Sequence, residues 1–233
     1  MSGPVRRHHP LRWIIGAVVV LALIVVGGPF VYIHFIEGPA PKPLALPETS
    51  THGAAPAGFP TGIWHVTSAS QVGYRVDEVL FGQNNVAVGR THSVSGSLTL
   101  ADAQVTKGAF TVKMATVHSD ESQRDNQFDG RIMDVATYPS AAFTLTSPIT
   151  LNASTKAGAT VSATATGNLT LRGQTHPVTF PVKARYSASA IDINGTIPIT
   201  FATWAIPNPS FAGSITVQNH GLLEFLLILG PGS

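Results

Sequence analysis

The chain has 233 residues, of which 44% are hydrophobic and only 11% are charged. It contains no cysteine, which excludes disulfides, thiolate metal sites and thiol catalysis. Beyond residue 38, five Lys and six Arg are balanced by eleven Asp and Glu, so no basic body is available to hold a nucleic-acid backbone, and we expect no nucleic-acid partner.

The first element is an apolar run, Trp13–Ile36, that contains no Asp, Glu, Lys or Arg. A helix of roughly 20 apolar residues crosses a bilayer, so we predict a single transmembrane helix over 13–36. Arg6, Arg7 and Arg12 precede it, and such a cluster normally stays cytoplasmic. We therefore expect a cytoplasmic arm over residues 1–12 and an extracytoplasmic domain held at the cell membrane.

A cleaved signal peptide is the alternative interpretation of this run. Its apolar core would be about 7–15 residues long and would lead to a small-residue cleavage site. The run here is longer and leads into Phe30, Tyr32 and Phe35, which are typical of the aromatic belt of a true span. We favour an uncleaved signal-anchor.

Residues 37–62 are rich in Pro and Ala and offer little to bury. Proline biases the backbone toward extended conformations, so we predict a linker that lifts a domain off the membrane. Residues 63–233 remain, about 170 residues, which suffice for one domain with its own core.

From Trp64 onward, apolar and polar residues alternate with period two, most clearly in 157–171 and 178–186. Strict alternation indicates antiparallel strands with one face toward the core and one toward water. Short clusters of turn residues separate these strands. We place turns at 101–103, 154–158, 172–174 and 193–195.

Residues 120–135 break the alternation, because Phe128, Ile132 and Met133 recur at helical spacing. We expect a short helix there that acts as a lid. The apolar run 221–229 is too short to span a membrane as a helix. We predict that it is the closing strand, with its outer face packed under the loop 204–211.

Many strands with one dry face each leave two architectures, a sandwich or a closed barrel. A barrel of about eight strands either fills its interior with side chains or holds a ligand there. Small residues on the expected inner face, such as Ala159, Ala163, Ala165 and Ala184, favour a void. Large neighbouring side chains could instead fill this void, namely Phe110, Phe143, Phe180 and Phe201. The alternation pattern leaves a hollow and a filled interior equally open.

Two long motifs resemble the YceI-like family. In 118–143, an Arg124-Asp125 pair is followed by a short helical stretch and then by Asp-Val-Ala-Thr-Tyr-Pro and Phe143. In 167–178, the sequence GNLTLRGQTHPV is similar to the family's G-x-L-T-x-R-G-x-T-x-P-V hairpin. Trp64 resembles the opening Trp of the family and Val88-Gly89 its V-x-G step.

The resemblance implies a lipocalin-like antiparallel barrel that encloses a polyisoprenoid chain, such as an isoprenoid quinone or a prenyl phosphate, without a catalytic centre or a cofactor. Relatives usually carry an Asp-x-x-His-Ser sequence after the opening Trp and a further His after the first strand. Here those places read Thr67-Ser68-Ala69-Ser70 and Asp77-Glu78. The contacts of those histidines are therefore not carried over.

We predict an all-β, lipocalin-like barrel of about eight strands with a short lid helix, preceded by a single transmembrane helix. We expect it to bind an isoprenoid-type lipid passively and to exchange it with a neighbouring membrane protein. The alternative is an exported structural or protein-interaction barrel with a self-filled core. No acid–base set, nucleophile elbow or metal-ligand spacing is visible in the sequence, so we expect neither an enzyme nor a metal site.

Strand parity and lid spacing nominate the ligand-binding residues. Arg124 has two interpretations: its planar fork could bind a diphosphate or a quinone carbonyl, or Arg124-Asp125 could pin the lid to the rim, which we favour. The nominated residues are Tyr74, Phe110, Val112, Met114, Arg124, Phe128, Ile132, Met133, Phe143, Ala163, Ala165, Phe180, Ile199 and Phe201.

Overall fold

The structure, a computed structural model, describes residues 16–21, 39–47, 60–151, 157–211 and 215–232. Residues 16–21 are helical, while the rest of the predicted membrane span lies outside the described residues. Among the helices that the structure describes, none combines the length and the apolar character needed to cross a membrane.

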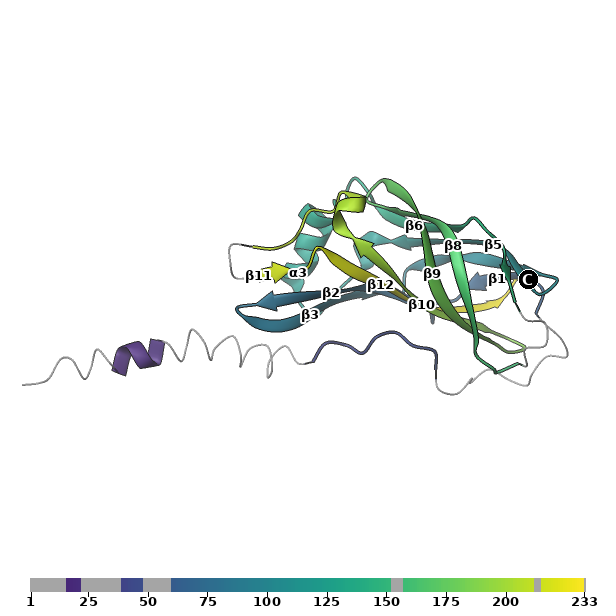
Figure 1. The fold of residues 1–233 in the computed structure, drawn as a ribbon, viewed down its shortest axis with the longest axis horizontal. Coiled ribbons are helices and arrows are strands. Elements are labelled where there is room, and N and C mark those ends of the chain that lie inside the picture. Colours follow the sequence, from purple (N-terminus) through teal and green to yellow (C-terminus); the bar gives the residue numbers. More distant parts are fainter. Residues whose placement is uncertain (1–15, 22–38, 48–59, 152–156, 212–214, 233) are drawn as a thin grey trace, which may run out of the picture.

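The described strands form one antiparallel sheet of twelve strands (Figure 1). Eight of them close into a ring in the order β1-β4-β5-β6-β8-β9-β10-β12, because β12 pairs with β10 on one side and with β1 on the other. The predicted all-β barrel of about eight strands is therefore confirmed. The strands are β1 (Gly62–Val66), β2 (Gln71–Leu80), β3 (Gln83–Thr91), β4 (Val94–Ala101), β5 (Gln104–Lys113), β6 (Ser140–Leu145), β7 (Ile149–Thr150), β8 (Val161–Leu171), β9 (Gln174–Tyr186), β10 (Ile191–Thr200), β11 (Ile215–Val217) and β12 (His220–Pro231).

The closure of the barrel depends on β12, as predicted for the run 221–229. The end of β12 pairs with β1, where Leu229 lies opposite Val66. An earlier part of the same edge, Leu222 to Leu226, pairs with β2. Because β3 and β11 both pair with β2, these three strands extend the wall beyond the ring at one end of the barrel.

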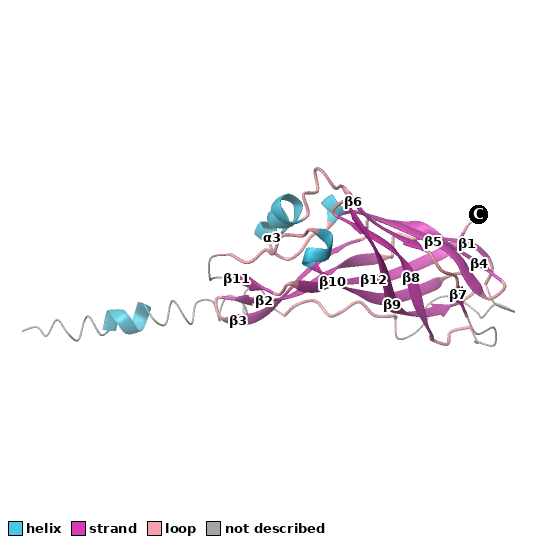
Figure 2. Cartoon of the chain, turned by 45° about the horizontal axis from the view of Figure 1, so that its top comes forward, coloured by secondary structure: helices cyan, strands magenta, loops and turns pink. Residues whose placement is uncertain are grey.

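Short helices lie over this extended end (Figure 2). They are η3 (Met114–Thr116), α3 (Ser122–Gln127), η4 (Phe128–Ile132) and η5 (Phe201–Trp204). The predicted short helix is thus present. Glu121 caps α3 by accepting a hydrogen bond from the backbone N–H of Gln123, and the η4 side of the lid buries Phe128 and Met133 in the core.

One predicted turn is wrong, because Ile193-Asn194-Gly195 lies inside the continuous strand β10. Gly195 serves close packing there rather than a turn: a Cβ atom at this position would come within 2.6 Å of the Phe225 ring. The actual turn precedes β10, where the Ser187 N–H donates to the Ala190 carbonyl and the Ser187 hydroxyl accepts from the Ala190 N–H.

The surroundings of β12 also differ from expectation. The loop 204–211 does not lie over its outer face; instead it buries Trp204 and Ile206 in the core beside the lid. The described part of the predicted linker, residues 39–47, runs along the outside of the barrel beneath β2 and β3 (Figure 1). There the backbone N–H of Leu44 donates to Glu224, a β12 residue.

Candidate functional site

The barrel encloses a cavity of about 1050 Å³. Its wall combines the core near the lid, for example Phe180 and Ile199, with the core at the opposite end, for example Leu98 and Leu227. Ligand sites in proteins typically measure about 300–1,000 Å³ and are mostly apolar. The interior is therefore hollow rather than filled by its own side chains, which decides between the two interiors that the alternation pattern left open.

Small residues on the wall keep the lumen open. Ala163 and Ala165 on β8 lie opposite Val182 and Phe180 on β9. Aromatic rings then pack against one another along the wall: Phe180 makes edge-to-face contacts with Phe143 and Phe225, with ring centroids 5.3 and 5.9 Å apart. All three rings line the cavity.

Every residue nominated from the sequence lies on this wall. Tyr74 comes from β2, Arg124 from α3 and Phe128 from η4, so the structure brings the strand and lid residues together around one space. That they contact a ligand stays a prediction. The complete nominated set on the wall is Tyr74, Phe110, Val112, Met114, Arg124, Phe128, Ile132, Met133, Phe143, Ala163, Ala165, Phe180, Ile199 and Phe201.

The wall at the end far from the lid was not predicted from the sequence. Leu98 and Leu100 line it, and their shared parity in β4 was the signal that could have found them. Glu78 was missed as well, although it has the same parity as Tyr74 in β2. Phe81 lies in the β2–β3 turn and Phe211 forms an isolated bridge with Ile215, so neither belongs to a regular alternating strand that could have indicated it.

The cavity opens beside the lid. The wall residues at the opposite end, such as Leu98 and Tyr186, are buried. Beside the lid, in contrast, wall residues from the β2–β3 turn, the lid helices and the segment before β11 are exposed. These exposed residues define the mouth: Phe81, Gln123, Asn126, Gln127, Arg131 and Phe211.

A stacked aromatic pair joins the barrel wall to the lid just inside the mouth. The rings of Tyr74 and Phe128 lie 5.1 Å apart at an interplanar angle of 16°. Burial raises the pKa of the Tyr74 phenol, and the opposing effect of Arg124 is smaller. The phenol therefore remains protonated and uncharged at physiological pH.

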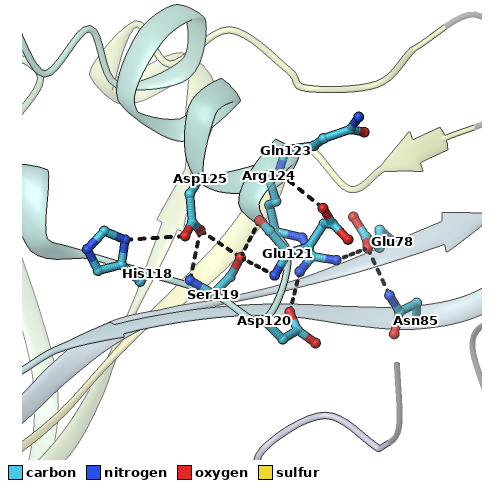
Figure 3. Close-up of polar contacts among 9 residues, drawn as sticks. All are labelled: Glu78, Asn85, His118, Ser119, Asp120, Glu121, Gln123, Arg124 and Asp125. Carbon is cyan, nitrogen blue, oxygen red and sulfur yellow. Dashed lines mark hydrogen bonds and ion pairs between the residues drawn. The ribbon is translucent and has the colours of Figure 1, made fainter. Parts of the chain in front are cut away.

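Arg124 lies between two carboxylates, as Figure 3 shows. Its Nη2 is 3.3 Å from Oε1 of Glu78, and its Nη1 is 2.5 Å from Oδ1 of Asp120. Glu78 also accepts a hydrogen bond of 3.0 Å from the Asn85 amide. Burial alone would lower the pKa of Arg124, but Glu78 and Asp120 outweigh it and raise the pKa, so the guanidinium stays charged.

Asp125 fixes the other side of α3 (Figure 3). Its Oδ1 accepts from the Ser119 backbone N–H at 2.8 Å and from the Ser119 hydroxyl at 2.7 Å, while Oδ2 lies 3.2 Å from Nδ1 of His118. Arg124 thus links the lid to β2, and Asp125 links it to the segment that leads into α3. This geometry agrees with the structural interpretation of the pair.

The polar cluster at the mouth has a surplus of negative charge, because Glu78 and Asp120 bring two carboxylates to one guanidinium. Glu78 belongs to the Asp77-Glu78 pair, one of the places at which the sequence departs from the pattern of the family that it resembles. The mouth therefore offers uncharged hydrogen-bonding groups, whereas the half-buried guanidinium of Arg124 is already paired with carboxylates.

The model of the YceI-like domain matches residues 64–226 of the chain. The crystal structure of BcnA from Burkholderia cenocepacia is similar, with 20% sequence identity, a TM-score of 0.56, and coverage of 70% of this chain and 98% of that one. A polyisoprenoid binding domain from Saccharophagus degradans, implicated in plant cell wall breakdown, has 14% identity, a TM-score of 0.59, and coverage of 74% and 99%. At these identities the two likenesses show a shared fold. No curated protein matches the chain.

Proposed function

This chain belongs to the YceI-like domain family, and we propose that its barrel binds one isoprenoid-type lipid with the tail enclosed in the cavity. The proposal rests mainly on the apolar cavity of about 1050 Å³ that opens beside the lid. Burial of apolar surface contributes about 25 cal/mol per Å², so a long hydrocarbon chain gains several kcal/mol by leaving water. The polyisoprenoid-binding domain from Saccharophagus degradans, which shares the fold, supports this class of ligand.

We further propose that the head group is uncharged, as in an isoprenoid quinone, rather than a prenyl phosphate. A phosphate would have to displace Glu78 and Asp120 from Arg124, and would otherwise approach two carboxylates. Arg131, a second cation at the mouth, is exposed and directed at the carbonyls of Asn208 and Pro209. The neutral phenol of Tyr74 is a suitable hydrogen-bond donor for a quinone carbonyl.

The proposed setting is the outer side of the cell membrane, with the run 13–36 as the anchor and the N-terminus in the cytoplasm. The role is passive binding rather than catalysis. Anchoring keeps the barrel near the bilayer in which such lipids reside, and it raises the effective concentration for exchange with a neighbouring membrane protein.

The test is lipid extraction from the purified full chain, followed by mass spectrometry of the extract. We expect close to one prenyl lipid per chain. The double variant Ala163→Leu with Ala165→Leu, which fills part of the lumen, is expected to retain less lipid than the wild type. A folded wild-type chain that yields no prenyl lipid and takes up no added quinone would contradict the proposal.

A further inference from the structure

We propose that the mouth of the barrel is a docking surface for the lipid bilayer, with Phe81 and Phe211 as the inserted residues and residues 39–47 as the strap that sets this orientation. The inference rests on the proposed membrane anchor, but it does not require a lipid to be bound in the cavity.

Two large apolar side chains lie exposed at the mouth. Phe81 in the β2–β3 turn is 57% exposed, and Phe211 before β11 is 66% exposed. Both also line the cavity, so the apolar interior continues onto the surface at this point. Exposed apolar patches that continue into a binding cavity mark sites of contact with a partner, and here a bilayer is the partner that offers the same apolar chemistry as the lumen.

The backbone at Phe81 supports a role outside the core. Its φ is +48°, in the left-handed region, and Gly82 follows with φ +81°. A two-residue hairpin turn of this kind prefers Asn-Gly, and a bulky residue in the left-handed region costs about 1–2 kcal/mol. A Cβ atom at position 81 therefore lowers the stability of the turn, and the ring that it carries stays exposed, which is explained if Phe81 serves contact with a membrane.

The strap, residues 39–47, is held by its backbone. The Arg75 guanidinium donates to the Pro41 carbonyl at 2.5 Å, and that of Arg90 donates to the Lys42 carbonyl. Farther along the strap, Asn194 donates to the Leu44 carbonyl at 2.8 Å and Arg185 to the Pro47 carbonyl at 2.6 Å. Contacts along its whole described length fix both the path and the direction of the strap.

The buried carboxylate of Glu224 holds together the side chains that bind the strap. Glu224 on β12 is 2% exposed. Its Oε1 lies 2.7 Å from Nη2 of Arg90 and its Oε2 lies 3.4 Å from Nε of Arg75. The strap completes the cluster, because the Leu44 N–H donates to Oε2 of Glu224 at 3.3 Å. The same carboxylate thus orients both guanidinium groups that bind the strap carbonyls.

The strap shortens the connection between membrane and barrel. A free extended linker over 37–62 would reach about 80 Å, at about 3.1 Å per residue. With residues 39–47 bound, the end of the predicted span at Ile36 is only about 10 Å of chain from Pro39. The strap enters beneath β2 and β3 and runs toward the end that carries β1 (Figure 1), so the anchor joins the barrel in the half that holds the mouth.

The test uses site-directed spin labels, for which the absence of native cysteine is an advantage. Single variants Phe81→Cys and Phe211→Cys are labelled in the full chain, reconstituted in phosphatidylcholine–phosphatidylglycerol vesicles. Ile63→Cys is the matched control, because Ile63 is an apolar β1 residue with 52% exposure at the opposite end of the barrel. Collision of each label with lipid-soluble oxygen and with a water-soluble nickel chelate is then measured.

We expect oxygen to dominate at positions 81 and 211 and the nickel chelate at position 63. Labels at 81 and 211 that are as accessible to nickel as the label at 63, in a chain that floats with the vesicles after a carbonate wash, would overturn the docking surface. Failure to float would instead contradict the proposed anchor. Lipid extraction remains a separate readout for the cavity.

A second variant tests the strap without altering any packed residue. Insertion of a flexible Gly-Ser segment of about 12 residues between Gly38 and Pro39 lengthens the connection between the membrane anchor and the strap. We expect the oxygen-to-nickel accessibility ratio at position 81 to fall at least threefold. An unchanged ratio would show that the strap does not set the orientation, and would overturn that part of the proposal.

Discussion

Tyr74 of the barrel wall and Phe128 of the lid stack face to face, with ring centroids 5.1 Å apart. The contact joins a residue of the first long strand to a residue in a helical segment that is remote in the sequence. It lies directly inside the mouth, so the same pair stabilises the lid and forms the upper wall of the cavity.

Loss of this stack should loosen the lid. For Phe128→Ala we expect the free energy of unfolding to fall by about 3 kcal/mol, because Phe128 is buried and truncation of a core Phe costs about 3–5 kcal/mol. Urea denaturation monitored by circular dichroism measures the change. Tyr74→Phe keeps the ring and should change stability by less than about 1.5 kcal/mol. Equal losses in the two variants would show that the hydroxyl, rather than the stack, is the stabilising group.

Stability should fall at high pH because of Tyr74. Its pKa is raised in the folded protein, so above the ordinary tyrosine pKa of about 10 the unfolded chain releases a proton that the folded chain keeps. The folded state then binds more protons, and the free energy of unfolding decreases as the pH rises beyond about 10. Denaturation curves at pH 9 and at pH 11 should show a smaller decrease for Tyr74→Phe than for the wild type. Parallel decreases would assign the effect to other groups.

Filling the lumen should reduce lipid uptake without unfolding the protein. In Ala163→Leu with Ala165→Leu, the added methyl groups enter the cavity, so we expect quinone affinity to fall at least tenfold while the melting temperature stays the same or rises. Isothermal titration with a short-chain quinone measures the affinity. The control is Ala109→Leu, because Ala109 lies exposed on β5 and does not line the cavity. Unchanged uptake by the folded double variant would refute the placement of the ligand.

Removal of the carboxylates around Arg124 should change head-group preference. Glu78→Gln with Asp120→Asn removes two carboxylates that pair with the guanidinium, so prenyl phosphate should bind at least tenfold tighter than to the wild type, while quinone affinity stays within about threefold. Competition between the two lipids in a native mass spectrum gives the ratio. Asp77→Asn removes one exposed carboxylate of the same strand outside the cluster and serves as the control. Tight binding of prenyl phosphate by the wild type would contradict the neutral head group.

Glu224 should hold the strap, residues 39–47, against the barrel. Glu224→Gln removes the shared counterion of Arg75 and Arg90, and loss of one partner of a buried ion pair costs about 3–5 kcal/mol. We expect lower stability and faster hydrogen exchange of the Leu44 amide, measured by mass spectrometry of peptides that cover 39–47. Glu78→Gln also removes a carboxylate that is only partly exposed, but Glu78 lies at the mouth, and the variant should leave this exchange unchanged.

Much of the wall could be predicted because a strand with one dry face places alternate residues on it. This rule assigned Phe180 and Ala165 to the lumen, and the helical spacing of Phe128 and Met133 indicated the lid. Alternation does not give the total volume of the inward side chains relative to the space inside the barrel. The sequence therefore left a hollow and a filled interior equally open. Gly195 was misread for a related reason: glycine favours turns, but here the Phe225 ring occupies the space of its side chain.

The strap left no trace in the sequence pattern. Its contacts use the backbone carbonyls of Pro41, Lys42, Leu44 and Pro47, and carbonyl groups are present at every residue. Only the receiving side carries distinctive residues, and Arg75, Arg90 and Glu224 come from three different strands. No spacing rule along one segment can bring them together.

The position of β12 in the chain has a consequence for the timing of assembly. Thr67 donates two hydrogen bonds to the carbonyl of Ile228, which lies 161 residues later in the chain. The edge of β1 that closes the ring therefore has no partner until β12 has been synthesised. A topology with such distant pairings folds slowly. Until β12 is in place the sheet has no enclosed lumen, so a ligand can be enclosed only after translation has passed β12.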